Sequence, residues 1–337
     1  MIRVAVVGFG LAGSVFHAPA IQADPALSLA AIVTADPARR AHAEQNYPST
    51  RVVGGFGELP FGELDAVVVA TPPGSHVALG HAALDAGLAV VVDKPFAPSS
   101  AEALELIAHA EQAGRLLTVY QNRRWDGEFQ TVQELLRQGA FGEVTRFESR
   151  MERWAPEISK PWKASAGPGH GVLFDLGAHL IDQALQLFGP VQRVYGELDA
   201  RRAQEPSDDD VFLALQHASG VRSHLAMNLT SAQFAPRIRV LGTAGGYLKQ
   251  HGDLQEAQIQ AGILPGDDRY GVDPEPHWGW FGQGDQLRAV PTVRGDYPRF
   301  YALLAAALNG SGPPPVDPLD AVAALRIIEE VRTQNGL

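Results

Sequence analysis

The sequence predicts an α/β protein with a doubly wound parallel sheet at the N-terminus, followed by an α/β domain with a large, mostly antiparallel open sheet. Three observations predict this class. Short apolar runs alternate with helical stretches up to residue 121, longer strand-like runs with few helices follow, and the first run ends in the glycine-rich segment VGFGLAG. Such alternation is typical of βαβ units around a parallel sheet. We therefore expect two domains, residues 1–121 and 122–337.

The first domain carries continuous, Val-rich apolar runs, as the strands of a parallel sheet buried on both faces require. These runs are Ile2–Val7, Leu27–Val33, Ala66–Ala70, Ala89–Val92 and Leu116–Tyr120. Helical stretches lie between them, among them His76–Ala86 and Ser100–Ala113. We therefore expect a parallel sheet with right-handed crossover connections.

The second domain changes to longer, alternating strands. The expected strands are Val144–Glu152, Val191–Ala200, Asp210–His217, Val221–Asn228 and Arg237–Leu241, and the expected helices are Phe129–Gln138 and Leu173–Leu187. This order predicts a mostly antiparallel sheet with helices on one face. The stretch Gly252–Asp296 has no clear period, so we expect a long loop there. Two helices close the chain, the first opened by GDYPRFYALLAAAL and the second capped by Asp317.

Composition and charge exclude several classes of function. The 337 residues carry a formal net charge of −11 without a basic run, whereas nucleic-acid binding needs a basic face. The chain has no cysteine for disulfides or thiolate metal sites. No apolar run approaches the roughly 18 residues of a membrane span, so we expect no membrane partner and a cytoplasmic location. The acidic run Asp208–Asp210 is expected to be a solvated loop rather than a metal site.

The first strand is followed by three glycines with the spacing G-x-G-x-x-G. Gly8 permits a tight turn, Gly10 lets the backbone approach a pyrophosphate, and Gly13 lets the next helix pack on the sheet. The helix N-terminus then offers N–H groups to the phosphates. A glycine turn without a ligand is the alternative, but the position between strand and helix favours a dinucleotide-binding Rossmann domain. The expected cofactor contacts in the turn are Gly8, Phe9, Gly10, Leu11, Ala12 and Gly13.

The end of the second strand bears on the choice of cofactor. An NAD site usually has an acidic residue there for the ribose hydroxyls, but this chain has Thr34. Asp36 follows in a position suited to capping the next helix, and Arg39 and Arg40 come after it. A small hydroxyl with nearby guanidinium groups leaves room for a 2′-phosphate. We therefore expect NADP to be preferred, with NAD as the alternative cofactor.

Polar residues follow two further strands of the first domain. Ligands of open α/β sheets bind beyond the carboxyl ends of the strands, which is where we expect these residues to lie. The segment TPPGSH contributes Thr71, Pro72 and His76 as expected cofactor contacts, and DKP contributes Asp93 and Lys94. Lys94 is also the candidate catalytic residue, although an ordinary surface lysine is the alternative.

The segment GVLFDLGAHLIDQALQLFG holds the other candidate catalytic residues. Asp175 and His179 are four residues apart, so they share one face of a helix. Taken alone, this pair favours another interpretation, in which Asp175 is an N-cap and His179 a buried, hydrogen-bonded imidazole. A metal site is disfavoured because no further ligands have recognisable spacing.

The ordered motifs resemble one family of enzymes. GFGLAG, TPPGSH, DKP, NRRWD at residues 122–126 and DLGAHLID occur in the order seen in the Gfo/Idh/MocA oxidoreductases, and the similarity covers nearly the whole chain. It is greatest to bacterial members similar to NADP-dependent scyllo-inositol dehydrogenase. Asn122, the first residue of NRRWD, is an additional expected cofactor contact.

The resemblance implies an oxidoreductase acting on a sugar or polyol, with Lys94, Asp175 and His179 at the positions of the family's catalytic residues. It also implies a homodimer or homotetramer formed through the second sheet. Two positions depart from the usual pattern: Asp93 replaces a more common Glu, and Gly74 stands where many members have Asn.

The residue chemistry agrees with hydride transfer. The imidazole of a histidine has a pKa of about 6.5, so a neutral His179 could act as the general base that accepts the alcohol proton. The ammonium of Lys94 would polarise the oxygen. Three alternatives remain: a non-catalytic NADP-sensing regulator, an NAD-dependent glycosidase of the same family, and an imine or biliverdin-type reductase.

Overall fold

The computed structural model describes residues 1–158, 169–202 and 207–337, and the chain divides into two compact units. Unit 1 comprises Met1–Asn122, Gln255–Tyr270 and Asp296–Val322, and unit 2 comprises Arg123–Leu254, Gly271–Gly295 and Ala323–Leu337. The division into domains 1–121 and 122–337 stays a prediction. The compact units differ from it because two later segments join the N-terminal part.

Unit 1 is built on a parallel six-stranded sheet with the order β3-β2-β1-β4-β5-β6. The strands are β1 (Ile2–Val7), β2 (Leu27–Val33), β3 (Arg51–Val53), β4 (Ala66–Val69), β5 (Ala89–Asp93) and β6 (Leu117–Tyr120). The predicted doubly wound sheet is confirmed, and this strand order is that of a Rossmann fold. The order reverses between β1 and β4, and the carboxyl ends of these two strands carry the glycine turn and TPPGSH.

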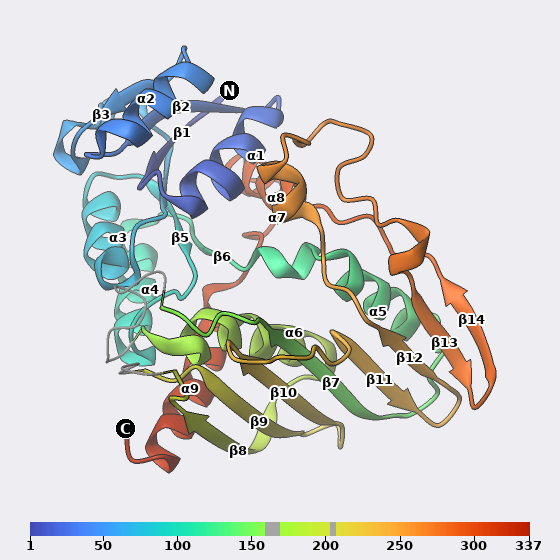
Figure 1. Ribbon diagram of the computed structural model, residues 1–337. Helices are drawn as coiled ribbons and strands as arrows, with labels where there is room; N and C mark the ends of the chain where they lie inside the picture. Colours follow the sequence, from blue (N-terminus) through green and yellow to red (C-terminus); the bar gives the residue numbers. More distant parts are fainter. Residues whose placement is uncertain (159–168, 203–206) are drawn as a thin grey trace. The chain divides into compact units, whose positions relative to one another are not determined.

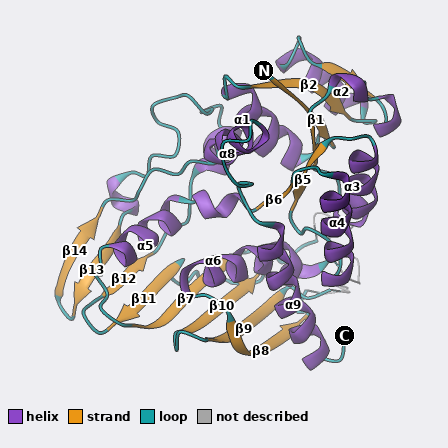
Figure 2. Cartoon of the chain, turned by 180° about the vertical axis from the view of Figure 1, so that it is seen from behind, coloured by secondary structure: helices purple, strands orange, loops and turns teal. Residues whose placement is uncertain are grey.

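Helices cover both faces of this sheet. In Figures 1 and 2, α3 and α4 lie on one face, and α1 and α8 lie on the other. The helical elements of unit 1 are η1 (Ala12–His17), α1 (Ala18–Ala23), α2 (Pro37–Asn46), η2 (Phe56–Glu58), η3 (Phe61–Glu63), η4 (Pro73–Ser75), α3 (His76–Asp85), α4 (Ser100–Ala113), α7 (Gln255–Gln260) and α8 (Pro298–Leu308). The four residues of β4 are all buried, as a sheet covered on both sides requires.

Unit 2 is built on an eight-stranded sheet with the order β14-β13-β12-β11-β7-β10-β9-β8. The strands are β7 (Val144–Glu152), β8 (Val191–Asp199), β9 (Asp210–His217), β10 (Arg222–Asn228), β11 (Ile238–Gly242), β12 (Gly246–Lys249), β13 (Gly279–Gln283) and β14 (Gln286–Val290). Only the pair of β7 and β10 is parallel among these strands, so the predicted mostly antiparallel sheet is confirmed.

One face of this second sheet is covered by α5 and α6, and the views show no helix on its opposite face in the described part of unit 2 (Figures 1 and 2). The helical elements are α5 (Gly127–Arg137), η6 (Leu173–Gly177), α6 (Ala178–Phe188) and η7 (Glu275–His277). Two further elements, η5 (Asn122–Trp125) and α9 (Pro318–Gln334), begin in unit 1 and continue in unit 2. The last turn of α9 is tied to β8, because Gln334 donates a side-chain hydrogen bond to the carbonyl of Val194 at 3.0 Å.

The prediction of a long loop over Gly252–Asp296 is wrong. This stretch contains α7 and the hairpin of β13 and β14, which extends the sheet beyond β12. Four of the five residues of β14 are exposed, so burial leaves little alternation in its sequence. Pairing with a neighbouring strand, rather than local pattern, therefore decides this part of the sheet.

The prediction of a solvated acidic loop at Asp208–Asp210 is also wrong. Asp208 and Asp209 are buried. Asp209 accepts hydrogen bonds from the backbone N–H groups of Arg201 and Arg202, at 2.7 and 2.8 Å, and from the Arg202 guanidinium. A buried carboxylate loses its hydration, which is why the acidic run was expected to be exposed. The N–H donors offset that cost for Asp209.

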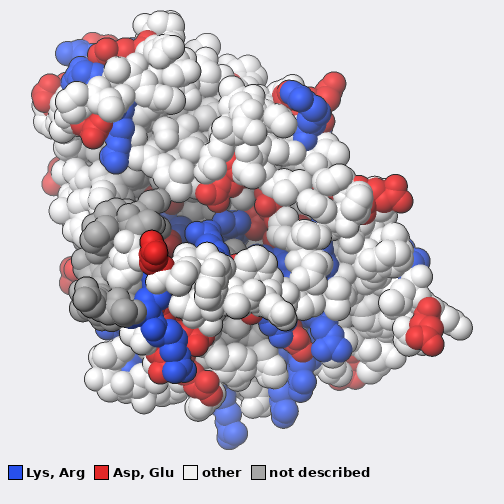
Figure 3. Space-filling model, in the orientation of Figure 1, with Lys and Arg blue, Asp and Glu red and all other residues white. Residues whose placement is uncertain are grey.

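Charges of both signs are interspersed on the face shown in Figure 3. This distribution fits the net charge of −11 and gives no extended basic surface on the described part of that face. Among the described residues, none of the helices combines the length and apolar character that a membrane crossing demands.

Candidate active site

The glycine turn after β1 requires glycine at two of its positions. Gly8 has φ +96°, and a Cβ added there would lie 2.7 Å from the carbonyl oxygen of Ala70. A Cβ on Gly13 would lie 2.1 Å from the carbonyl oxygen of Gly8. The turn is therefore pressed against the end of β4 and against itself, so larger residues would displace the backbone.

Gly10 has a different environment, which fits an approaching phosphate. The nearest atom to a Cβ added at Gly10 would be Nη1 of Arg39, at 3.7 Å. The turn therefore leaves open space bordered by a guanidinium group at the position where a dinucleotide comes closest to the backbone. Phe9 is 1% exposed and its ring packs edge-on against Tyr47, so only its backbone faces this turn and its side chain belongs to the core. Leu11 is the N-cap residue of the helical segment η1, which begins at Ala12.

The two arginines after β2 have unequal roles. Asp36 accepts a hydrogen bond from the backbone N–H of Arg39 at 2.9 Å and so caps α2. The side chain of Arg40 donates to the carbonyl of Val52 at 3.1 Å and lies 3.5 Å from Glu44. Arg39 is exposed and borders the glycine turn, whereas Thr34 is buried at the end of β2. Arg39 is thus the arginine that borders the glycine turn, and its contact with a 2′-phosphate stays a prediction.

The segment TPPGSH forms η4 and the start of α3. Thr71 accepts a hydrogen bond from the Ser75 hydroxyl at 2.7 Å, and Pro72 precedes η4. His76 is 1% exposed, and its ring nitrogens lie 2.9 and 2.8 Å from the carbonyl oxygens of Pro95 and Thr71. His76 therefore joins the segments that follow β4 and β5, and its contact with a cofactor stays a prediction.

Lys94 follows β5 directly and is half-buried. Its backbone N–H donates to the carboxylate of Asp93 at 2.8 Å. Asn122 is 5% exposed at the start of η5. Lys94, Asp93 and Asn122 belong to unit 1, together with the glycine turn.

Asp175 and His179 lie on consecutive helical segments of unit 2. Asp175 belongs to the π-helical segment η6 and is half-buried, while His179 belongs to the first turn of α6 and is 4% exposed. Asp175 is not an N-cap, because Val172 precedes η6 and Gly177 precedes α6. Single π-helical turns inside α-helices occur frequently at functional sites.

Two anchors hold this helix in place. Asp208 accepts a hydrogen bond from the backbone N–H of Leu173 at 2.7 Å, at the start of η6. Asp182 on α6 binds Arg124 with two hydrogen bonds, of 2.9 and 2.5 Å. The predicted motifs NRRWD and DLGAHLID are thus brought together within unit 2, and the bidentate pair fixes their relative orientation.

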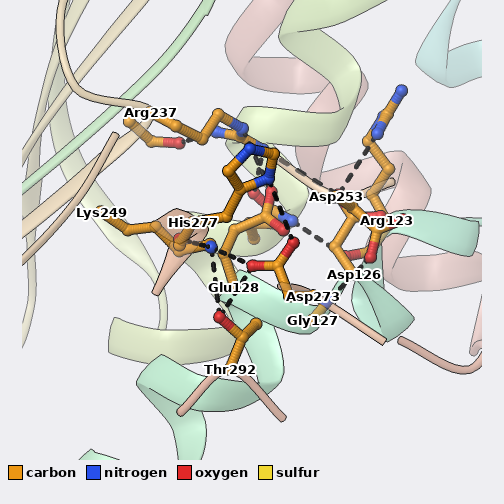
Figure 4. A network of polar contacts seen from close by, with 12 residues as sticks. Arg123, Asp126, Gly127, Glu128, Arg237, Lys249, Asp253, Asp273, His277 and Thr292 are labelled. Atoms are coloured by element: carbon orange, nitrogen blue, oxygen red, sulfur yellow. Dashed lines mark hydrogen bonds and ion pairs between the residues drawn. The ribbon is translucent and has the colours of Figure 1, made fainter. Parts of the chain in front are cut away.

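A buried charged network in unit 2 was missed by the sequence analysis (Figure 4). Lys249 on β12 is fully buried, contacts the Asp273 carboxylate, and donates to Thr292 at 3.1 Å and to the carbonyl of His277 at 2.6 Å. The sequence signal is the position of the lysine in a strand. Lys249 lies two residues after the buried Tyr247, so both side chains point to the inward face of β12.

The second centre of the network is Glu128 on α5, which is fully buried. Its Oε1 lies 3.2 Å from Nε of Arg237, and Arg237 also donates to Ser149 at 2.6 Å. Burial, and then the charge of Asp126, raise the pKa of Glu128 to about 7, although Arg237 acts in the opposite direction. This carboxyl group therefore titrates near neutral pH.

Comparisons with known proteins bear on both units. Residues 2–121 match the model of an oxidoreductase family with an NAD-binding Rossmann fold, and residues 129–248 match that of the GFO/IDH/MocA C-terminal domain. The oxidoreductase YdgJ of Escherichia coli strain K12 is 37% identical over 334 residues, which cover 97% of this chain and 94% of YdgJ. IolW of Bacillus subtilis strain 168, named as an NADP-dependent scyllo-inositol 2-dehydrogenase, is 30% identical and covers 97% of this chain and 92% of its own. The solved structure of the oxidoreductase YPO2259 from Yersinia pestis superposes with a TM-score of 0.91 at 35% identity, over 99% of this chain and 95% of that one.

Proposed function

Because the chain belongs to the Gfo/Idh/MocA family of NAD(P)-binding oxidoreductases, we propose that it transfers a hydride between a nicotinamide and a secondary alcohol or ketone of a sugar or cyclic polyol. The observation that carries the proposal is that the chain has both a lysine at the end of β5 and a buried histidine in the first turn of α6. An inositol-like substrate is supported by the name of IolW.

The cofactor proposal rests on the glycine turn and Arg39. When bound, the nicotinamide nucleotide supplies the hydride acceptor or donor. The backbone around Gly10 holds the pyrophosphate, and the guanidinium of Arg39 holds the 2′-phosphate. NADP is therefore the preferred cofactor, and NAD the weaker one.

The proposed catalytic roles follow from charge and proton affinity. The Lys94 ammonium polarises the substrate oxygen and stabilises the negative charge that develops on it. Neutral His179 accepts the hydroxyl proton in alcohol oxidation and returns it in ketone reduction. Asp175, which precedes His179 by four residues, orients the imidazole.

The helix-free face of the second sheet is the proposed oligomer interface. Tyr195 on β8 and Trp280 on β13 are 56% and 50% exposed. Large exposed rings on an open sheet face are typical of surfaces that bind a partner. A homodimer or homotetramer formed through this face would cover them.

The test is an activity panel of inositols and aldoses with NADP and NAD, in both directions, followed at the absorbance of the reduced nicotinamide. We expect at least one polyol or sugar to be oxidised, with NADP preferred. Tight cofactor binding without turnover of any member would favour a regulator. Sugar release from a glycoside with no net reduction of cofactor would favour a glycosidase.

A further inference from the structure

A buried histidine lies close to Asp93, the last residue of β5, which directly precedes Lys94. His17 is the last residue of η1, the segment opened by the glycine turn, and it is 0% exposed. Its Nδ1 lies 2.6 Å from the hydroxyl of Tyr301, and its Nε2 lies 3.8 Å from Oδ2 of Asp93. Three segments distant in the sequence therefore meet at one imidazole within unit 1.

The chemistry of the three groups assigns the protons. Tyr301 on α8 is fully buried, and burial, followed by the charge of Asp93, raises the pKa of its hydroxyl well above the ordinary value. The phenol therefore stays protonated, and in the arrangement that we propose it donates to Nδ1 of His17. In this arrangement a neutral imidazole carries its proton on Nε2. Nε2 lies 3.8 Å from Oδ2 of Asp93, which is an ion-pair distance rather than a hydrogen bond, and an ionised Asp93 carboxylate stabilises the N–H that points toward it.

The surroundings of Asp93 favour the ionised form. Burial acts to raise the pKa of this carboxyl group. The electrostatic interaction with His17 lowers it, and the interactions with Lys94 and with His76 on α3 add to this effect, so the net shift of the pKa is downward. Tyr301 on α8 also interacts with Asp93, since the charge of Asp93 helps to raise the pKa of the Tyr301 hydroxyl. The other carboxylate oxygen, Oδ1, accepts the backbone N–H of Lys94 at 2.8 Å.

We propose that Tyr301, His17 and Asp93 form a buried positioning relay that fixes the backbone of Lys94 at the end of β5. The catalytic consequence of the relay rests on the proposed function, in which Lys94 is catalytic, whereas the contacts among the three residues do not. Tyr301 and His17 are positioning residues, because they act through Asp93.

Packing alone does not require these side chains. A buried imidazole and a buried hydroxyl lose their hydration, and that cost is offset only by suitable polar partners. Phenylalanine would fill the volume of Tyr301 equally well, so the hydroxyl is the part of the residue that serves the relay. Tyr120 offers a matched control, since its ring also packs on His17, with centroids 4.3 Å apart, and it is 1% exposed.

The first experiment compares Tyr301→Phe with Tyr120→Phe by NMR of the full chain, labelled with ¹⁵N. In the wild type we expect His17 to carry its proton on Nε2, and the amide resonance of Lys94 to report a lowered pKa for Asp93. Tyr301→Phe should change the ¹⁵N shift of Nδ1, move the Lys94 amide resonance and raise the pKa that it reports. Tyr120→Phe should leave the Lys94 amide and its titration unchanged.

The second experiment measures kinetics with whichever polyol is turned over. Tyr301→Phe should lower kcat roughly tenfold with KM unchanged, because a displaced Lys94 still allows binding but misaligns the ammonium. Tyr120→Phe should keep kcat within about twofold at the same loss of thermal stability.

Three results would overturn the relay. One is a wild-type His17 with its proton on Nδ1, the second is an unchanged Lys94 amide in Tyr301→Phe, and the third is an equal fall of kcat in both variants. If no substrate is turned over by the wild type, the proposed function fails, but the NMR comparison still decides the relay.

Discussion

At the scale of single residues, Lys94 is the most direct test of the proposed chemistry. Lys94→Ala should abolish turnover, because the developing negative charge on the substrate oxygen loses its cation. Cofactor binding should largely survive, since the glycine turn and Arg39 are untouched. Turnover assays and cofactor titration by fluorescence check both parts. Near wild-type turnover would show that the assigned role is wrong.

The two arginines after β2 give a matched pair for cofactor preference. Arg39→Ala should weaken NADP binding by roughly 1.5–3 kcal/mol, the range of a charge-assisted hydrogen bond, and leave NAD binding nearly unchanged. Arg40→Ala should have a smaller effect, because that guanidinium already binds the Val52 carbonyl and lies near Glu44. Calorimetry with both cofactors measures the difference. Equal affinities of the wild type for NADP and NAD would contradict the proposal.

His179 is tested through the pH profile. His179→Asn keeps a similar size but cannot accept the proton, so kcat for alcohol oxidation should fall by roughly 10²–10⁴ while substrate binding persists. The wild-type rate should fall at acid pH as the base becomes protonated, and this acid limb should be absent from the variant. If the variant keeps both the rate and the limb, the base is another group, with neutral Lys94 the next candidate.

At the scale of elements, the charged network around α5 makes stability depend on pH. The pKa of Glu128 is raised from 4.5 to about 7 in the folded state, so the protonated form is the one that folding favours. Its contribution is fully present below the unfolded pKa and is lost as the pH rises through about 7.

Glu128→Gln should remove that dependence. Urea unfolding at intervals from pH 5 to pH 8 should show the wild type losing stability with rising pH by more than the variant loses. A control is Glu134→Gln, whose carboxylate lies on the same helix, pairs with Arg137, and has its pKa lowered by that hydrogen bond. Parallel curves for the wild type and Glu128→Gln would contradict a titration of Glu128 near neutrality.

At the scale of the whole molecule, oligomer size tests the proposed interface. Light scattering should give a dimer or tetramer for the wild type. Trp280→Lys should weaken the assembly, because it puts a strongly hydrated charge on the helix-free face. Leu104→Lys changes an exposed residue on α4, which belongs to unit 1, and should leave the mass unchanged. A monomeric wild type would contradict the proposal.

The sequence by itself determined five of the six strands of the first sheet, all except the short β3, and five of the eight strands of the second. Continuous apolar runs predict buried parallel strands, and β1 and β2 have the predicted bounds. The glycine turn could also be predicted from the local sequence. Glycine is required at Gly8 because a Cβ there would meet the end of β4, and at Gly13 because a Cβ there would meet the carbonyl of Gly8. Capping of α2 by Asp36 likewise depends on residues three positions apart.

Tertiary structure decided the polar interactions. His17 and Tyr301 are 284 positions apart, and the buried pair of Glu128 and Arg237 joins α5 to the segment before β11. The periodicity of the sequence does not predict such pairs, because each partner is a single polar residue in an otherwise apolar pattern. The hairpin of β13 and β14 was missed for a related reason, since it is formed by pairing with β12 at the edge of the sheet and buries too little surface to leave a pattern. Local patterns record burial, whereas buried charges are stabilised only by partners that the fold brings to them.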